Sequence, residues 1–390
     1  MPNFDDYRSE LELLNNTGMM RSLRTLGRGE NGLAFVEGTP LVNLCSNDYL
    51  SFAEDKNLHA EFYSQMSEAN ILDGYGLGSA SSRLLSGNHP AYEEAERYIG
   101  KLYGKPCLLF NSGYHANIGI LPALSKKGDL ILSDKLNHAS IIDGLRLSDA
   151  NFVRYRHLDY AHLESILEKK RHLYKRVFIV TESIFSMDGD LADLKILAEI
   201  KERFDALLYV DEAHALGTRG KNGLGLAEEQ NVLEKIDLLV GTFGKAVASA
   251  GAFVCCAPVL RDYLINKSRS LIFTTALPPV IPHWIRFVFQ KCVEATERRS
   301  LLEKKSNRLR EAVRNLGFPM PSESNIIPVI LGESDKCVSI AEKAMEDELL
   351  VLPVRPPTVP KGTSRLRISV CAKTPDPALD KLIACIQNGS

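Results

Sequence analysis

Two charged side chains that follow apolar runs could bind one ligand from opposite sides. Lys245 lies next to Gly244, shortly after the apolar run 238–241, and Asp211 directly follows the run 207–210. A lysine amine can form a Schiff base with a bound carbonyl, and a carboxylate can keep a pyridine nitrogen protonated. The pair therefore predicts a pyridoxal phosphate site. Burial should lower the pKa of Lys245 and supply the neutral amine that this chemistry requires.

Three other segments follow apolar runs and carry polar side chains. After the run 107–110, Ser112-Gly113 could begin a helix whose free N–H groups bind a phosphate, although a plain N-cap at Ser112 explains the same residues. His138 follows the run 130–132 and could stack on an aromatic ring, or it could be a hydrogen-bonded loop histidine. Ser186 is a weak signal, because turn chemistry at Asp188-Gly189 explains part of its segment.

Two motifs suggest other functions and are rejected. Asp211-Glu212-Ala213-His214 also marks the magnesium-binding strand of one helicase class, which requires a phosphate loop of the form G-x-x-x-x-G-K-[ST]. Gly244-Lys245 is followed by alanine and Gly220-Lys221 by asparagine, so neither provides the hydroxyl that binds magnesium. The segment 74–79 does not match the dinucleotide motif G-x-G-x-x-G, and we interpret it as a glycine-rich loop at the entrance of the site.

Composition is typical of an ordinary globular protein. The chain has 390 residues, 45% of them hydrophobic, and a formal net charge of -2, which gives no reason to expect nucleic acid or an anionic membrane as a partner. The eight cysteines show no C-x-x-C spacing, which favours buried reduced thiols over disulfides or a metal site. The start of the chain lacks the pattern of a signal peptide, and we expect a cytoplasmic protein.

Short apolar runs alternate with amphipathic segments between about residue 40 and residue 275. This alternation predicts an α/β fold with a mostly parallel sheet that has helices on both faces. The runs are 107–110, 130–132, 152–154, 177–181, 207–210, 238–241 and 252–256. We expect an N-terminal segment (1–45, helical and then turn-rich), a large domain (46–276) and a small α+β domain (277–390) that begins with a long helical stretch.

In their order, these segments resemble the α-oxoamine synthases, a family of pyridoxal phosphate enzymes with the aspartate aminotransferase fold (fold type I). The resemblance covers nearly the whole chain. It includes the segments 44–50 (LCSNDYL), 78–87 (GSASSRLLSG), 273–279 (FTTALPP) and 365–369 (RLRIS). It implies a seven-stranded sheet and a homodimer with active sites at the interface.

The resemblance also implies roles around the cofactor ring. Lys245 forms the Schiff base and acts as the catalytic base, and Asp211 contacts the pyridine nitrogen. His138 stacks on the ring and could supply a proton. His214 forms a hydrogen bond to the phenolic oxygen of the ring, with Ser186 nearby.

The phosphate and the substrate have their own implied residues. The phosphate is bound by Ser112, Gly113, Tyr114 and Thr242, with Thr274 or Thr275 contributed by the partner subunit. Arg367 pairs with the carboxylate of the amino acid, because a guanidinium can bind a carboxylate through two hydrogen bonds. Asn47 lies close to Arg367.

Within the family, the segments 84–87 and 355–360 resemble enzymes of biotin synthesis that condense L-alanine with a pimeloyl thioester, carried on CoA or on acyl carrier protein. Other members use glycine with acetyl-CoA, or serine with a long acyl chain, and these remain alternatives. An aminotransferase and a non-catalytic subunit of the same fold are further alternatives. Lys245 argues against the non-catalytic subunit.

Two positions depart from the common family pattern. Glu212 replaces an aspartate, and Thr181-Glu182-Ser183 replaces Thr-Asp-Gly. The departures bear on the hydrogen bonds around Ser186, and on the backbone at Ser183 if that position requires the φ of a glycine.

Overall fold

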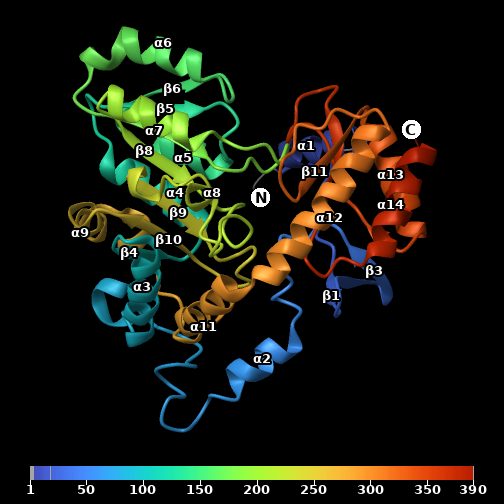
Figure 1. Cartoon of the computed structure of the whole chain (residues 1–390), viewed down its shortest axis with the longest axis horizontal. Helices are drawn as coiled ribbons and strands as arrows, with labels where there is room; N and C mark the ends of the chain where they lie inside the picture. Colours follow the sequence, from blue (N-terminus) through green and yellow to red (C-terminus); the bar gives the residue numbers. More distant parts are fainter. Residues whose placement is uncertain (1–3, 18, 390) are drawn as a thin grey trace.

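A seven-stranded sheet forms the core of the larger part of the structure, a computed structural model that describes residues 4–17 and 19–389 (Figure 1). The strand β10 is antiparallel to both of its neighbours, and the other pairs in the sheet are parallel. The strand order is β4 (Cys107–Phe110), β10 (Ala252–Cys256), β9 (Leu238–Thr242), β8 (Leu207–Asp211), β7 (Val177–Glu182), β5 (Leu130–Asp134) and β6 (Asn151–Tyr155). The predicted α/β fold with a mostly parallel sheet is confirmed.

Helices cover both faces of this sheet, which is why its inner strands are largely apolar, whereas the edge strand β6 is mostly exposed. Successive residues of one strand point to opposite faces: Leu208 and Val210 of β8 pack in one core, and Tyr209 packs in the other. One face is covered by α3 (Pro90–Tyr103), α6 (Tyr160–Lys170), α7 (Leu194–Arg203) and α11 (Val280–Glu294). The other is covered by α4 (Gly113–Leu124), α5 (Ala139–Leu147), α9 (Pro258–Lys267) and α10 (Arg269–Ile272).

The C-terminal part contains a second, three-stranded antiparallel sheet. Its strands, in order, are β11 (Ile326–Gly332), β14 (Ser364–Ser369) and β13 (Pro353–Val354). The helices α13 (Ser334–Glu346) and α14 (Asp376–Gly389) belong to this part, which has the predicted α+β character. The expected long helical stretch is two helices, because the chain leaves the helical conformation at Ala295 between α11 and α12 (Thr296–Asn315).

The N-terminal segment contains strands that the sequence analysis missed. After α1 (Asp5–Asn16) come β1 (Leu26–Arg28), β2 (Leu33–Val36) and β3 (Thr39–Asn43), and β3 pairs in parallel with β12 (Leu349–Leu350). The glycines that suggested a turn-rich segment instead form the turns between strands, since Gly32 and Gly38 have φ of 78° and 86°. A sheet thus joins the N-terminal segment to the C-terminal part.

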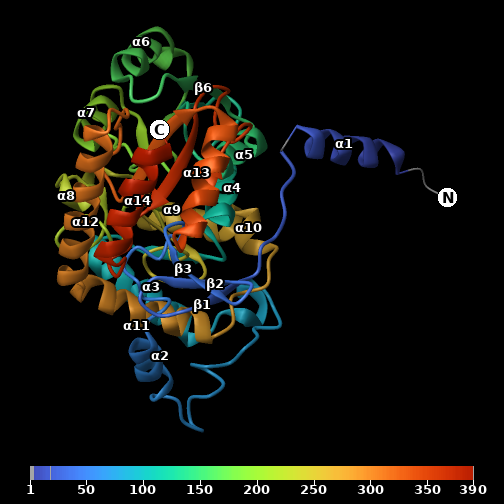
Figure 2. The same cartoon turned by 90° about the vertical axis from the view of Figure 1, so that its right-hand side faces the viewer.

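The remaining elements are short, and α1 stands apart. Helix α1 has no buried residue and extends away from the rest of the chain (Figure 2). The short elements are α2 (Lys56–Tyr63), α8 (Leu226–Glu229), η1 (Arg83–Gly87), η2 (Arg171–Leu173) and η3 (Leu233–Lys235). No helix among residues 4–17 and 19–389 is long and apolar enough to cross a membrane. All eight cysteines are free, and seven of them are buried.

The contact between β9 and β10 gives a test of the sheet. A Cβ added at Gly241 would lie 2.5 Å from the ring of Phe253, closer than two carbon atoms tolerate. We expect Gly241→Ala to lower the free energy of unfolding by about 1–3 kcal/mol, the range for overpacking of a core. Urea unfolding measures the change. Gly78→Ala is the control, because nothing lies within 4 Å of its added Cβ; equal stability of both variants would contradict the packing.

Candidate active site

The predicted ring-binding residues meet at the carboxyl ends of the parallel strands. Asp211 ends β8, Lys245 lies three residues beyond the end of β9, and His138 lies between β5 and α5. Nζ of Lys245 is 2.8 Å from Nε2 of His214. The carboxyl ends of neighbouring parallel strands form the usual ligand site of such sheets, so the topology brings these side chains together.

Asp211 is a buried carboxylate, and each of its oxygens accepts a hydrogen bond. Its Oδ2 accepts a hydrogen bond of 2.9 Å from Nδ2 of Asn117, and its Oδ1 accepts one of 2.9 Å from N of Ala213. The Tyr209 hydroxyl donates in turn to Oδ1 of Asn117, which fixes the orientation of the amide. The sequence analysis did not single out Asn117, although it lies on the helix after the Ser112 segment. These donors stabilise a negative charge at the end of β8.

The amine of Lys245 has a lowered pKa. Burial lowers its pKa to about 8, and the negative charges of Asp211 and Glu182 oppose that change without cancelling it. A substantial fraction of the amine is therefore neutral slightly above neutral pH. This is the form that can react with a carbonyl or accept a proton from carbon.

His214 is a neutral ring between two partners. Burial, followed by the nearby charge of Lys245, lowers the pKa of His214 well below its usual value. Its Nδ1 lies 2.7 Å from the hydroxyl of Tyr49, and its Nε2 faces Lys245. Burial raises the pKa of Tyr49 to about 12, so this residue keeps its phenolic proton. Tyr49 lies in a segment that carried the family resemblance but was given no role.

His138 caps helix α5 with its own ring. Nδ1 accepts a hydrogen bond of 3.2 Å from N of Ser140, which places the ring proton on Nε2. Burial lowers the pKa of His138, so the ring is neutral at neutral pH. Its backbone N donates to Oε1 of Glu182 at 2.5 Å.

The residues predicted to bind phosphate lie around the start of α4. Ser112 is the N-cap of this helix, since its Oγ accepts a hydrogen bond from N of His115 at 3.2 Å. The hydroxyl of Ser112 therefore has the capping role that the simpler interpretation gave it. A Cβ added at Gly113 would make an ordinary van der Waals contact of 3.5 Å with Cβ of Thr242, so these two residues lie side by side. The hydroxyl of Tyr114 donates to Asp143. The first N–H groups of α4 have no acceptor within the helix and suit an anion.

Thr274 and Thr275 lie beside Asn111 of the same chain. Nδ2 of Asn111 donates to Oγ1 of Thr274 at 3.2 Å and to the carbonyl of Thr275 at 2.8 Å. Asn111 directly precedes the N-cap Ser112. The contribution of one of these threonines to the site of a partner subunit stays a prediction.

Arg367 reaches the site from β14 and brings two further predicted residues with it. Its Nε donates to the carbonyl of Ser186 at 2.6 Å, its Nη1 donates to Oγ of Ser369 at 2.8 Å, and its Nη2 lies 3.5 Å from Oδ1 of Asn47. A cavity of about 830 Å³ borders Asn47 and Lys245 and is also lined by Arg24, Arg28 and Trp284.

The two departures from the family pattern have local explanations. Oε2 and Oε1 of Glu212 accept hydrogen bonds from N of Leu226 (3.0 Å) and of Ala227 (2.7 Å), so the longer side chain caps the short helix α8. Ser183 is absent from the described non-glycine residues that have a positive φ, and its backbone N donates to the carbonyl of Asp211 at 3.0 Å. Serine therefore fits this backbone.

Comparisons with known proteins agree on one family. The model of the class I and II aminotransferases matches residues 39–386. An 8-amino-7-oxononanoate synthase from Chlorobaculum parvum is 48% identical over 390 residues, which cover 100% of this chain and 99% of the relative. Serine palmitoyltransferase from Sphingomonas wittichii has a TM-score of 0.89 at 31% identity and covers 99% of this chain and 96% of its own. A structure of a serine palmitoyltransferase with pyridoxal phosphate bound as an internal aldimine has a TM-score of 0.89 at 28% identity, covering 99% of this chain and 97% of its own.

The lowered pKa of Lys245 gives a prediction about its reactivity. Pyridoxal phosphate followed by borohydride should label Lys245 of the apoprotein at a rate that rises with pH and reaches half of its maximum at about pH 8. Mass spectrometry of tryptic peptides measures the label. Exposed lysines of the same sample are the control, because ordinary amines have a pKa of about 10.4. A Lys245 profile that matches theirs would contradict the burial argument.

Proposed function

This chain belongs to the class I and II aminotransferase family, and on that premise we propose that it condenses L-alanine with a pimeloyl thioester. The products are 8-amino-7-oxononanoate, carbon dioxide and the free thiol carrier, in biotin biosynthesis. The full-length identity of 48% to an 8-amino-7-oxononanoate synthase supports this activity over the activities of the other α-oxoamine synthases. The observation that carries the chemistry is the buried Lys245 amine, 2.8 Å from His214 in a site that also contains Asp211.

The residues of the site fit pyridoxal phosphate. Asp211 presents a buried carboxylate suited to a protonated ring nitrogen, and Lys245 presents an amine suited to the aldehyde. Helix α4 begins at Gly113, beside Thr242, and its N-terminal N–H groups suit the phosphate. Pyridoxal phosphate, when bound, supplies the electron sink that makes the α-proton of an amino acid acidic.

The residues of this chain then have separate tasks. Asp211, with its charge held by Asn117 and Ala213, keeps a proton on the ring nitrogen. Nζ of Lys245 removes the α-proton of alanine, a task suited to an amine with a pKa of about 8. The neutral Nε2–H of His138 is available to donate a proton.

Arg367 binds the carboxylate of alanine in this proposal. Its hydrogen bonds to the carbonyl of Ser186 and to Ser369 fix the plane of the guanidinium, and Asn47 lies at its other edge. A fixed guanidinium orients the amino acid, which lowers the entropic cost of reaching the reactive geometry. The acyl thioester would occupy the cavity beside Lys245, where Arg24 and Arg28 add positive charge.

We also infer a homodimer in which Thr274 or Thr275 completes the phosphate site of the partner subunit. Phe273, which directly precedes these threonines, is 71% exposed, and this supports burial by a second copy. A cytoplasmic location and the three-part division 1–45, 46–276 and 277–390 stay predictions of the sequence.

The substrate assignment can be tested with one assay matrix. Alanine, glycine and serine are each paired with pimeloyl, acetyl and palmitoyl thioesters, and thiol and carbon dioxide release are measured. We expect turnover with alanine and the pimeloyl thioester and much less with every other pair. Turnover of glycine with acetyl-CoA, or of serine with palmitoyl-CoA, in place of the expected pair would reassign the activity within the family.

A substitution of Arg367 tests the site of the amino acid. Arg367→Lys keeps the charge but loses the planar pair of donors. We expect the KM for alanine to rise about 10- to 100-fold, because hydrogen bonds to a charged group contribute about 1.5–3 kcal/mol. Steady-state kinetics measure the change, and Arg314→Lys on the exposed side of α12 is the control. An unchanged KM would remove Arg367 from substrate binding.

A further inference from the structure

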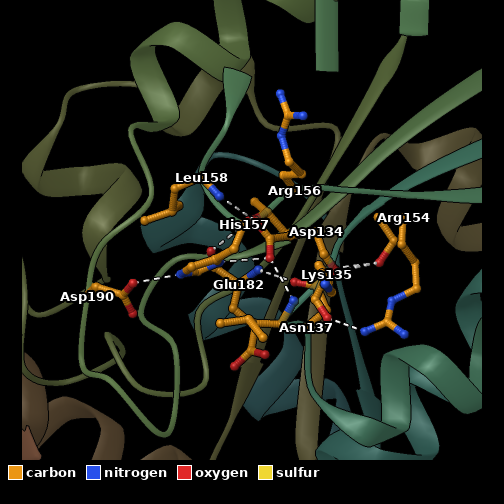
Figure 3. Close-up of polar contacts among 12 residues, drawn as sticks. Asp134, Lys135, Asn137, Arg154, Arg156, His157, Leu158, Glu182 and Asp190 are labelled. Carbon is orange, nitrogen blue, oxygen red and sulfur yellow. Dashed lines mark hydrogen bonds and ion pairs between the residues drawn. The ribbon is translucent and has the colours of Figure 1, made fainter. Parts of the chain in front are cut away.

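A histidine lies between two carboxylates beside the candidate active site (Figure 3). Nδ1 of His157 is 2.9 Å from Oδ1 of Asp134, and Nε2 is 2.6 Å from Oδ2 of Asp190. The side chain of Asp134 is fully buried, that of Asp190 is 14% exposed and that of His157 is 21% exposed. The edge of the imidazole also packs against the ring of Phe185, with the ring centres 4.4 Å apart. No role has been assigned to these residues above.

The geometry determines the charge of the imidazole. A neutral histidine has one N–H, whereas here both ring nitrogens face carboxylate oxygens. Oδ1 of Asp134 also accepts a hydrogen bond from N of Leu136 (2.8 Å), and its Oδ2 accepts one from N of Leu158 (3.0 Å). Both carboxylate oxygens of Asp134 therefore act as acceptors. A doubly protonated ring provides a donor at each ring nitrogen for the two carboxylates, while Oδ1 of Asp190 is buried without a hydrogen-bond partner among the described residues.

The balance of effects on the His157 proton agrees with this assignment. Burial alone would lower the pKa of His157, but the hydrogen bonds to Asp134 and Asp190 outweigh it and raise the pKa to about 10. The other titratable groups near the two carboxylates include the phenols of Tyr155 on β6 and Tyr160 on α6, and the carboxyl group of Glu182 on β7, whose pKa is raised to about 8, chiefly by burial. Burial raises the pKa of both phenols, so they add no charge in this range.

Asp134, one of the two carboxylates that contact His157, shapes the loop that ends at His138. Asp134 is the last residue of β5, and its hydrogen bond from N of Leu136 shapes the turn that follows. Asn137 then donates to the carbonyl of Val180 at 2.8 Å and accepts from N of Glu182 at 3.0 Å. The next residue, His138, donates its backbone N to Glu182. The position of the His138 ring therefore depends on the turn that Asp134 anchors.

The other partner of His157, Asp190, lies at the end of the loop after β7. The carbonyl of Asp190 accepts from N of Phe185 at 3.1 Å, which closes the loop. Between them, the carbonyl of Ser186 accepts from Arg367, and Asp188 forms an ion pair with the buried Arg365. This loop thus sets the position of the Arg367 guanidinium.

We propose that His157, as an imidazolium between Asp134 and Asp190, is a positioning residue that fixes the β5 and β7 loops to one another and thereby aligns His138 with Arg367. This inference rests on the proposed function, which assigns both aligned residues to the reaction. His157 itself does not touch the reacting atoms. Its role is to cross-link two segments that are 33 and 23 residues from it in the sequence.

The charge of His157 can be measured without turnover. In protein labelled with ¹⁵N-histidine, NMR should show a His157 ring with both nitrogens protonated at pH 8 and a titration near pH 10. Asp190→Asn removes one negative partner and should move this titration to lower pH. A wild-type His157 signal that is neutral at pH 8 would overturn the proposal.

Stability should depend on pH in a defined direction. The pKa of His157 is raised on folding, so its contribution is complete below about pH 6.5, declines as pH rises and is lost above about pH 10. The difference in Tm between wild type and His157→Gln should therefore shrink between pH 7 and pH 10. His172→Gln, a change at an exposed histidine, should leave Tm unchanged at both pH values. A difference that is constant with pH would exclude the charged state.

Kinetics separate a positioning role from a purely structural one. We expect His157→Gln and Asp190→Asn each to raise the KM for alanine and to lower kcat. Together these changes should lower kcat/KM by about 10- to 100-fold, the scale expected for a small misplacement of catalytic groups. His172→Gln should match wild type. Stability loss with unchanged KM and kcat would overturn the proposal. Should no substrate pair be turned over even by wild type, the proposed function fails, and the NMR titration and the Tm series still decide the state of His157.

Discussion

The burial of an amine beside carboxylates at the end of one sheet is the constraint on which the rest of this site depends. Desolvation of Lys245 favours the neutral amine, and the charges of Asp211 and Glu182 favour the ammonium. Desolvation is the larger effect, so the pKa of Lys245 falls, but the opposing charges limit the fall to about 8. Without the opposing carboxylates the amine would be a weaker base, and with more exposure it would be almost fully protonated at neutral pH.

The two carboxylates could not both be charged without a cost, and the structure distinguishes them by their donors. Glu182 and Asp211 are directly opposite each other on the neighbouring strands β7 and β8. Asp211 receives hydrogen bonds from a side-chain amide and a backbone N–H, whereas the backbone N of His138 is the donor described for Glu182. Burial and the proximity of Asp211 raise the pKa of Glu182 to about 8, so Glu182 is largely protonated at neutral pH and Asp211 has the larger effect on Lys245.

The sequence revealed the parts of the site that lie at strand ends, and it missed those that act through side-chain packing. Each of the seven apolar runs lies in a strand of the central sheet, and all of these strands except the exposed edge strand β6 are buried on both faces, where apolar side chains are required. Asn117 and Tyr49 gave no such signal, because their roles come from contacts with residues 94 and 165 positions away. The strands β1 to β3 were missed for a related reason: their glycines suggest turns, and their pairing with β12 is invisible locally.

The binding of an amino acid then depends on how the C-terminal part sits against the central sheet. Arg365 and Arg367 are two residues apart on β14, so both side chains point to the same face of that strand. Arg365 pairs with Asp188 and Arg367 with the carbonyl of Ser186, both on the loop after β7. The first contact fixes the strand, and the second orients the guanidinium. A shift of β14 by one residue would turn both arginines away from the loop, so the register of the small sheet decides whether a carboxylate can be bound beside Lys245.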